Sequence, residues 1–239
     1  MGQITFQRGN IFTTSAQVLV NTVNCVGIMG AGMALECRYR YPDMFVEYKR
    51  LCTAHVIQPG HLHLWKRGNP WILNFPTKAH WRFPSKIEFI RSGLSDFARI
   101  CNEESLVSVA FPRLGTSHGG LEWEDVQPLM KSVLDSIPKV SFEIWEFDHE
   151  ADDGAFGKVA KLASGRGLDH FAGQMGLRHP QAAIAYEAIV SGAVRNMLAL
   201  QRVPGVGPKS VEKIYKWLYG MRGSSVRQQT PGLFEDELP

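Results

Sequence analysis

Short apolar runs alternate with longer amphipathic stretches over the first 150 residues. β-Branched and aromatic runs predict strands at residues 4–7, 17–21, 71–75, 105–111 and 140–145. Between them, apolar residues at helical spacing predict helices over residues 32–48, 85–103 and 124–137. Strands that alternate with helices favour a layered α/β structure over a helical bundle or a β-sandwich.

The pattern changes after residue 150. Segment 149–157, HEADDGAFG, is acidic and lacks periodic apolar residues, which predicts a linker. Beyond it, we expect Pro180 to open one long helix that ends near Leu200, and a second helix to follow. The first helix would bury Ile184, Ala188, Ser191, Val194 and Leu198, and the second Val211, Ile214, Tyr215 and Leu218. The sequence thus predicts one domain over residues 1–150, an all-α domain over 155–220 and a flexible tail over 221–239.

Composition narrows the class of protein further. Of 239 residues, 44% are hydrophobic and 21% charged, as in ordinary globular proteins. Because no run of about 18 apolar residues and no signal peptide is present, we expect a cytoplasmic protein without a membrane partner. The four cysteines lack C-x-x-C spacing, so we predict free thiols and no metal site.

Charge is distributed unevenly along the chain. Residues 1–154 contain 15 Lys/Arg and 17 Asp/Glu, whereas residues 155–220 contain nine basic residues and three acidic ones. A basic segment of this kind attracts a polyanion such as nucleic acid, although a solvated basic surface explains the charge equally well.

A glycine-rich stretch offers the first candidate chemistry. An apolar run leads into two asparagines and then into Gly27, Gly30 and Gly32, after which a helix is predicted. Glycines at a strand-to-helix turn allow close backbone approach, and the helix N-terminus offers unpaired N–H groups to an anion. The stretch matches neither the triphosphate-binding loop nor the dinucleotide-binding fingerprint.

A second stretch of the same kind follows a later strand. VAFPRLGTSHGGL places Gly115, Gly119 and Gly120 between an apolar run and the helix that begins near Trp123. Because the loops at the carboxyl ends of parallel strands share one edge of a sheet, both loops can close on the same diphosphate.

Five motifs in this order resemble those of one known family. They are GNI at residues 9–11, VNTVN at 20–24, GIMGAGMAL at 27–35, NFPTKAHWR at 74–82 and PRLGTSHGGL at 112–121. The chain resembles a macrodomain, and within that family the DarG type, the antitoxins that remove ADP-ribose from DNA bases. The terminal ADP-ribose glycohydrolases of eukaryotes are more distant relatives. The resemblance implies a three-layer α/β/α fold with a mixed central sheet.

The resemblance also implies which residues bind ADP-ribose. Asn10 would accept a hydrogen bond from the adenine amino group, where the family usually has Asp. Two phosphate-binding turns would lie at residues 30–32 and 115–120. The complete implied set is Asn10, Ile11, Gly30, Ala31, Gly32, Met33, Pro112, Leu114, Gly115, Thr116, Ser117, His118, Gly119 and Gly120.

Lys78 and Asn24 are the implied catalytic residues. Lys78 would act on the anomeric carbon of the ribose, either as a free amine nucleophile or as a cation that stabilises charge. Asn24 would orient a ribose hydroxyl, although an asparagine here also suits a turn. Eukaryotic relatives pair the lysine with an aspartate, whose place here is taken by Gly119; His118 is the nearest acid or base.

Two groups suggest contacts with DNA. His80, Trp81 and Arg82 could stack on a base and pair with a phosphate, or could pack only against their own loop. VPGVGPK at residues 203–209 resembles a helix-hairpin-helix turn, in which Gly205, Gly207, Lys209 and Lys213 would hold a phosphate.

Together these features predict a hydrolase that needs no cofactor and splits the N-glycosidic bond between ADP-ribose and a DNA base, thymidine or guanosine. Its partners would be ADP-ribose, DNA that is single-stranded or has an extruded base, and a toxin ADP-ribosyltransferase. The alternatives are a non-catalytic module that binds ADP-ribose or a related nucleotide signal, and an eraser of ADP-ribose from proteins. A third is an antitoxin whose helical domain binds and neutralises a toxin directly.

Overall fold

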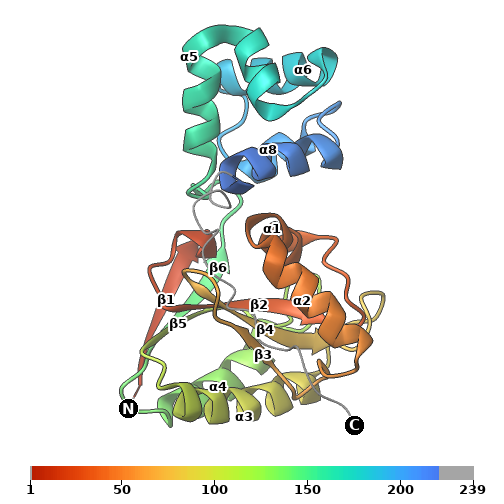
Figure 1. Ribbon diagram of the computed structural model, residues 1–239. Helices are drawn as coiled ribbons and strands as arrows, with labels where there is room; N and C mark the ends of the chain where they lie inside the picture. The colour runs from red at the N-terminus through yellow and green to blue at the C-terminus, as the bar shows by residue number, and fades with distance from the viewer. Residues whose placement is uncertain (1, 221–239) are drawn as a thin grey trace, which may run out of the picture.

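A six-stranded mixed sheet forms the centre of the computed structural model, which describes residues 2–220 (Figure 1). Its strands are β1 (Gln3–Gly9), β2 (Val18–Asn24), β3 (His63–Trp65), β4 (Trp71–Lys78), β5 (Ser108–Pro112) and β6 (Ser141–Phe147). They lie in the order β1-β6-β5-β2-β4-β3, and only β3 runs antiparallel to its neighbour. Five strands therefore end at the same edge of the sheet.

Helices cover both faces of this sheet. One face packs against α1 (Gly32–Arg40) and α2 (Pro42–Thr53), and the other against α3 (Ile87–Glu104) and α4 (Trp123–Asp135) (Figure 1). Phe97, Phe111 and Phe142 meet between the sheet and the second pair of helices. The rings of Phe97 and Phe111 lie edge to face, with their centres 4.9 Å apart. The predicted three-layer α/β/α arrangement with a mixed sheet is confirmed.

Two details of this part differ from the prediction. The helix expected over residues 32–48 is broken at Tyr41, because Pro42 lacks an N–H donor and disfavours a helical conformation at the residue before it. Strand β3 was missed since three residues are too few to show a period.

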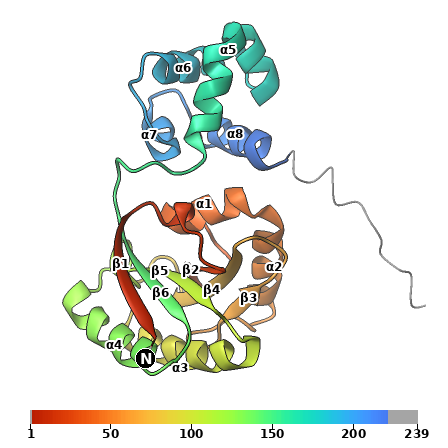
Figure 2. The same cartoon turned by 90° about the vertical axis from the view of Figure 1, so that its left-hand side faces the viewer.

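The remaining helices enclose a hydrophobic core of their own. They are α5 (Phe156–Met175), α6 (His179–Val190), α7 (Met197–Arg202) and α8 (Pro208–Gly220), packed around residues such as Phe171, Val211 and Ile214. Figures 1 and 2 show this segment beyond α1, at one end of the molecule. The tail predicted over residues 221–239 lies outside the described residues.

The single long helix predicted from Pro180 was wrong. The chain leaves α6 at Val190, turns through Gly192 with φ of +73°, and starts α7 after Asn196, whose Oδ1 accepts from the Ala199 N–H at 2.8 Å. The buried face of α6 is Ala182, Ala185 and Ile189, not the predicted face that contains Ile184. Alanines carry too little hydrophobic signal to set the phase of a periodic pattern. Helix α5 also begins at Phe156, inside the predicted linker.

A buried polar cluster joins α1 to the C-terminal helices. The Arg40 guanidinium donates to Glu36 Oε1, to the Asp153 carbonyl oxygen at 2.7 Å and to the Tyr219 hydroxyl at 2.7 Å. Beside it, the Tyr39 ring stacks on Tyr215 at 5.0 Å. The helical segment is therefore attached to α1 by packing and hydrogen bonds as well as by the chain.

Across residues 2–220, every helix is too short or too polar to cross a bilayer.

Candidate active site

Lys78 lies at the carboxyl end of β4. It is the last residue of the strand and pairs in register with Asn24, the last residue of β2, beyond an irregularity after Val23. Its ammonium donates a hydrogen bond to the carbonyl oxygen of His118 in the second glycine loop. The predicted catalytic lysine thus reaches from one strand end to the loop that follows another.

Burial makes it easier for the Lys78 ammonium to lose its proton. Partial burial lowers the pKa of the amine below its usual value. Its hydrogen-bond acceptor is a neutral carbonyl oxygen, which gives the charged form less stabilisation than a carboxylate would.

The two glycine loops meet beside this lysine. A Cβ on Gly32 would lie 3.3 Å from the His118 imidazole, so the start of α1 and the second loop are in contact. Gly32 has φ of +55°, a conformation that costs other residues free energy. Ala31, at the N-cap of α1, makes no side-chain capping bond, so the first N–H groups of the helix stay available to an anion. The predicted convergence of the loops is therefore present in the structure.

Gly119 has no room for a side chain. A Cβ there would lie 2.0 Å from the Gly115 carbonyl oxygen and 2.5 Å from Ser85 Oγ. The Ser85 N–H also donates to the Gly119 carbonyl oxygen at 2.9 Å, which joins the loop to the segment before α3. A side chain with a carboxylate at this position would therefore need a different backbone path.

Asn24 holds the first loop in shape. Its Oδ1 accepts from the Val26 N–H at 3.0 Å and the Ile28 N–H at 3.4 Å, and its Nδ2 donates to the Ile28 carbonyl oxygen at 2.6 Å. The Tyr48 hydroxyl donates to the Asn24 backbone carbonyl oxygen at 2.7 Å. Because both ends of its amide are already engaged, this geometry favours a positioning role for Asn24.

The adenine-binding residues proposed from the sequence lie at the end of β1. Asn10 is buried, and its Oδ1 accepts from the Phe12 N–H at 3.0 Å, which caps the short helix η1 (Ile11–Thr13). The Asp148 N–H donates to the Gly9 carbonyl oxygen at 3.0 Å, so the chain after β6 runs beside this segment.

The other predicted ADP-ribose residues follow β2 or β5. Pro112 ends β5, and Leu114 and Gly115 are buried beyond it. Thr116 donates through its hydroxyl to the Arg113 carbonyl oxygen at 3.0 Å. Met33 is half-buried. The residues exposed to solvent are Gly30, Ala31, Gly32, Ser117, His118 and Gly120. The whole set therefore follows strand ends at one edge of the sheet.

His80, Trp81 and Arg82 form a stacked group after β4. The rings of His80 and Trp81 stack at 5.6 Å, and the Arg82 guanidinium lies 4.8 Å from the centre of the Trp81 ring. The Arg82 N–H donates to His80 Nδ1 at 3.2 Å, which orders the turn while Trp81 stays 45% exposed. The Trp81 ring thus contacts His80 and Arg82 and keeps part of its surface in solvent.

The predicted hairpin residues lie between α7 and α8. Gly205 adopts φ of +91°, and the Val206 N–H donates to the Val203 carbonyl oxygen at 3.0 Å, which closes a tight turn. Gly207 and Lys209 are exposed at the start of α8, but Lys213 donates to the Gly176 carbonyl oxygen at 2.5 Å at the end of α5. Lys213 is thus occupied in holding two helices together.

Sequence reasoning missed several residues that support the site. Ser85, Tyr48 and Arg40 all act through loops or helices adjacent to the strand ends. Ser85 is the first residue of the helix predicted over 85–103, which gave the one sequence signal; its buried Oγ has no hydrogen-bond partner among residues 2–220. Contacts between segments far apart in the chain leave no periodic trace.

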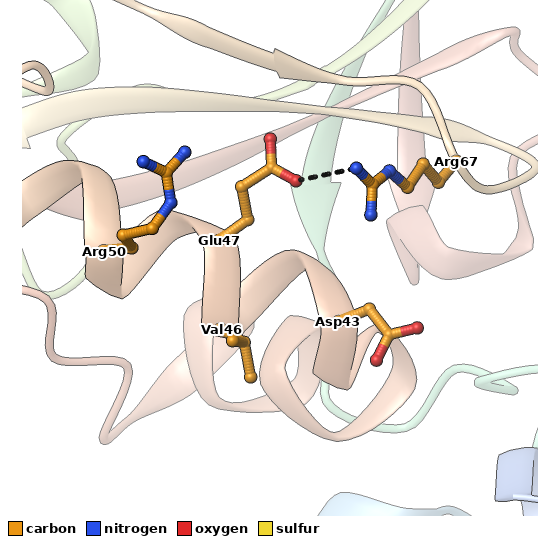
Figure 3. Close-up of a pocket in the computed structure, with 5 residues that line it drawn as sticks. All are labelled: Asp43, Val46, Glu47, Arg50 and Arg67. Atoms are coloured by element: carbon orange, nitrogen blue, oxygen red, sulfur yellow. Dashed lines mark ion pairs between the residues drawn. The ribbon is translucent and has the colours of Figure 1, made fainter. Parts of the chain in front are cut away.

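A series of hydrogen-bonded polar side chains, here called the polar chain, runs from β2 through β4 and β3 to α2. Asn21 donates to Asn74 Oδ1 at 2.9 Å, Asn74 contacts His63 at 3.3 Å, and His63 contacts Glu47 at 3.0 Å. Burial lowers the pKa of His63. Glu47 also borders a surface pocket of about 350 Å³ and reaches Arg67 at 4.0 Å (Figure 3).

This polar chain and its pocket include none of the predicted site residues. The pocket is lined by Asp43, Val46, Glu47, Arg50 and Arg67, at the outer side of α2. Within the described part of the chain, no group of three or more His, Cys, Asp or Glu side chains has the arrangement of a metal site. The four cysteines are free thiols, and burial raises the pKa of Cys25 to about 12.

Comparison with known proteins agrees with this geometry. Residues 20–130 match the model of the Macro domain family. A solved structure described as the macrodomain of Mycobacterium tuberculosis DarG matches with a TM-score of 0.59 and 41% identity, over 61% of this chain and 98% of that one. The fold is a three-layer α/β/α arrangement with two glycine loops at the carboxyl edge of its sheet. The chain belongs to the macrodomain family. Within the family, its similarity is to the macrodomains of DarG proteins.

Two full-length relatives add functional names. A Mycobacterium tuberculosis protein named DNA ADP-ribosyl glycohydrolase is 42% identical over 146 residues, which are 59% of this chain and 42% of that protein. A Thermosipho africanus protein, named a DNA ADP-ribosyl transferase-DNA ADP-ribosyl glycohydrolase fusion protein, is 34% identical over 148 residues, 54% of this chain and 38% of that one.

A solved structure of Thermosipho africanus DarTG in complex with ADP-ribose matches with a TM-score of 0.59 and 33% identity, over 63% of this chain and 43% of that chain. The matched region spans about two fifths of the length of each full-length relative.

Proposed function

We propose that the protein hydrolyses the N-glycosidic bond that links ADP-ribose to a base of DNA. The observation that carries the proposal is the position of the Lys78 amine, at the contact between two glycine loops. In the proposed complex the pyrophosphate lies between those loops, adenine lies near Asn10, and the distal ribose presents its anomeric carbon to Lys78. The names of the relatives support the reaction class and DNA as the carrier.

The residues then divide the work of the reaction. Backbone N–H groups of the glycine loops and of the start of α1 hold the diphosphate and fix the sugar. The bond from the anomeric carbon to the base nitrogen breaks, water supplies the oxygen that replaces it, and the base leaves with a proton. The partly desolvated Lys78 amine is placed to attack that carbon as the bond to the base breaks, which forms a covalent bond between the lysine nitrogen and the sugar. Water then breaks this bond, which releases ADP-ribose and restores the free amine, and the exposed His118 is placed to deliver the proton to the base. Asn24 keeps the first loop in position.

The direct test follows the mass of a modified oligonucleotide. Single-stranded oligonucleotides that carry ADP-ribose on thymidine or on guanosine are incubated with the wild-type protein, Lys78→Ala or Lys131→Ala. Lys131 is an exposed lysine on α4 and serves as the matched control. We expect the wild type and the control to release ADP-ribose and Lys78→Ala to lose at least a hundredfold in rate.

The outcomes separate the alternatives. Tight binding of ADP-ribose with no release by the wild type would show a non-catalytic binding module instead. Release from modified glutamate peptides but not from oligonucleotides would show a protein eraser.

We also propose that the helical segment holds the DNA strand. The tight turn after α7 and the exposed start of α8 with Lys209 support this, because such a turn can direct backbone N–H groups at a phosphate. The excess of basic residues in 155–220 supports a polyanionic partner. These contacts would position the strand without reading its sequence.

The full biological setting is part of the same proposal. One relative combines a transferase and a glycohydrolase in a single chain, which supports an ADP-ribosyltransferase as the partner whose product this protein removes. We retain the cytoplasmic location and the independence from cofactors as predictions of the sequence.

A further inference from the structure

Apolar side chains gather on two loops beside Lys78. Of the eleven large hydrophobic side chains exposed among residues 2–220, Val26 and Ile28 follow β2, and Trp81 and Phe83 follow β4. The loops are adjacent because the Cys25 N–H donates to the Ala79 carbonyl oxygen at 3.2 Å. Four of the eleven thus lie on the pair of segments that leave the strands ending in Asn24 and Lys78.

Hydrogen bonds fix the conformation of both loops, so their apolar side chains are held exposed to solvent. The Asn24 side chain makes three hydrogen bonds to backbone groups of Val26 and Ile28. On the other loop, the Phe83 N–H donates to the His80 carbonyl oxygen at 3.2 Å, and the His80 ring packs against both Trp81 and Phe83. Holding apolar side chains in water is unfavourable, and such patches mark binding surfaces.

The patch also adjoins the phosphate-binding turn. A Cβ on Gly30 would lie 3.7 Å from Cγ2 of Ile28, so this side chain borders the first glycine loop. On the opposite side, the peptide after Lys78 leads directly into the aromatic loop. A group bonded to the anomeric carbon in front of Lys78 would therefore emerge against these side chains.

The charge around the patch selects the kind of group. Neither 25–34 nor 79–86 contains an acidic residue, and the second stretch carries Arg82 and Lys86, both exposed. Flat aromatic rings suit stacking on a nucleobase, and the Arg82 guanidinium over the Trp81 ring suits the phosphates attached to that base.

On the basis of the proposed function, we propose that Val26, Ile28, Trp81 and Phe83 form a clamp that holds the modified nucleobase, unpaired, as the leaving group. A base inside a duplex cannot enter between two loops, so it must leave the helical stack first. The clamp thus selects an unpaired base as the substrate. By holding this leaving group, it also aligns the glycosidic bond that breaks.

Binding in a hydrolysis-deficient background tests the clamp without turnover. Full-length Lys78→Ala protein is titrated with a fluorescent single-stranded oligonucleotide that carries one ADP-ribosyl base, with the same strand annealed to its complement, and with free ADP-ribose. Ile28→Ser, Phe83→Ser and Trp81→Ala are added singly to this background, with Trp81→Phe as the conservative variant. Val107→Ser, an exposed valine just before β5 at the opposite edge of the sheet, is the matched control.

We expect Kd for the modified single strand to rise about tenfold in Trp81→Ala and Phe83→Ser, because stacking on one base contributes roughly that factor or more. Ile28→Ser should raise it as well, because apolar contact with the base is lost. Trp81→Phe and Val107→Ser should stay within about twofold of the background, as should the Kd of free ADP-ribose for all variants. Annealing the strand should weaken binding at least tenfold. Thermal melts confirm that each variant folds.

The clamp would be overturned if Ile28→Ser and Phe83→Ser left binding of the modified single strand unchanged. Equal losses with an ADP-ribosylated peptide would also overturn it, since the surface would then recognise no base. Failure of the proposed reaction gives a different result: the wild type leaves the oligonucleotide intact, whereas the clamp variants still weaken its binding.

Discussion

Lys78 donates its hydrogen bond to a neutral carbonyl oxygen, and partial burial lowers its pKa. In the deprotonated form the amine has a free electron pair for attack on carbon; the protonated form has none. Because the pKa lies below that of a free lysine, about 10.4, the reactive fraction rises as pH increases towards it. We expect the single-turnover rate to rise with pH and to level off at a lower pH than it would for a free lysine.

Lys78→Arg is the matched test of the other role. Arginine keeps the positive charge but does not deprotonate at accessible pH. The nucleophile model predicts that this variant is as inactive as Lys78→Ala. A wild-type rate that is flat or falls with increasing pH, together with substantial activity in Lys78→Arg, would assign electrostatic stabilisation to the lysine instead.

Gly119→Asp asks whether a carboxylate can be restored beside the lysine. We expect a loss of both stability and activity, because the new Cβ would overlap the Gly115 carbonyl oxygen and Ser85 Oγ. Overpacking of this kind costs about 1–3 kcal/mol, which a denaturant titration measures. Gly120→Asn is the control for stability: its site has space, and asparagine tolerates its positive φ. A stable, faster Gly119→Asp variant would contradict this account.

At the scale of elements, the sequence predicted what carries a strong local period. The five predicted strands and the helices α3 and α4 are present within a few residues, since each combines β-branched runs or a wide apolar face. The C-terminal helices were less accessible. In α6 the buried face consists largely of alanine, and in α5 glycines interrupt the pattern, including Gly167 with φ of +79°.

The candidate site shows the same division. Its loops could be located from glycines and asparagines because backbone geometry restricts the residue types that fit there. How the side chains are used could not be predicted: Asn24 is bonded to its own loop, and Lys213 to the end of α5. These bonds join segments whose proximity only the fold creates.

Arg40 forms a buried ion pair with Glu36, one turn earlier on α1, and its hydrogen bonds to Asp153 and Tyr219 link α1 to the C-terminal segment. Burial raises the pKa of the Glu36 carboxyl, and Arg40 lowers it part of the way back. Arg40→Met leaves this carboxylate buried without its cation, so we expect the free energy of unfolding to fall by about 3–5 kcal/mol. The double variant Arg40→Met, Glu36→Leu should recover much of that loss. Chemical denaturation of both variants checks this, and equal stability of the single and double variants would contradict it.

At the scale of the whole molecule, α1 connects two proposed activities. Its first residues border the proposed phosphate-binding turn, and its last turn packs against α8 and the segment before α5. Removing the helical segment would therefore uncover Tyr39 and Arg40 and disturb the site along with any DNA contact. Point substitutions on exposed residues separate the two effects more cleanly.

Lys209, exposed in the first turn of α8, is the residue to substitute. If it contacts a phosphate, Lys209→Gln should weaken binding of unmodified single-stranded DNA to a similar extent for all sequences. Each lost phosphate contact should also make the slope of log K against log salt concentration shallower by about 0.7. Affinity for free ADP-ribose should not change, and Lys131→Gln on α4 is the control. Identical salt slopes for the wild type and Lys209→Gln would show that the strand is held elsewhere, because a contact that releases no counterions is not a phosphate contact.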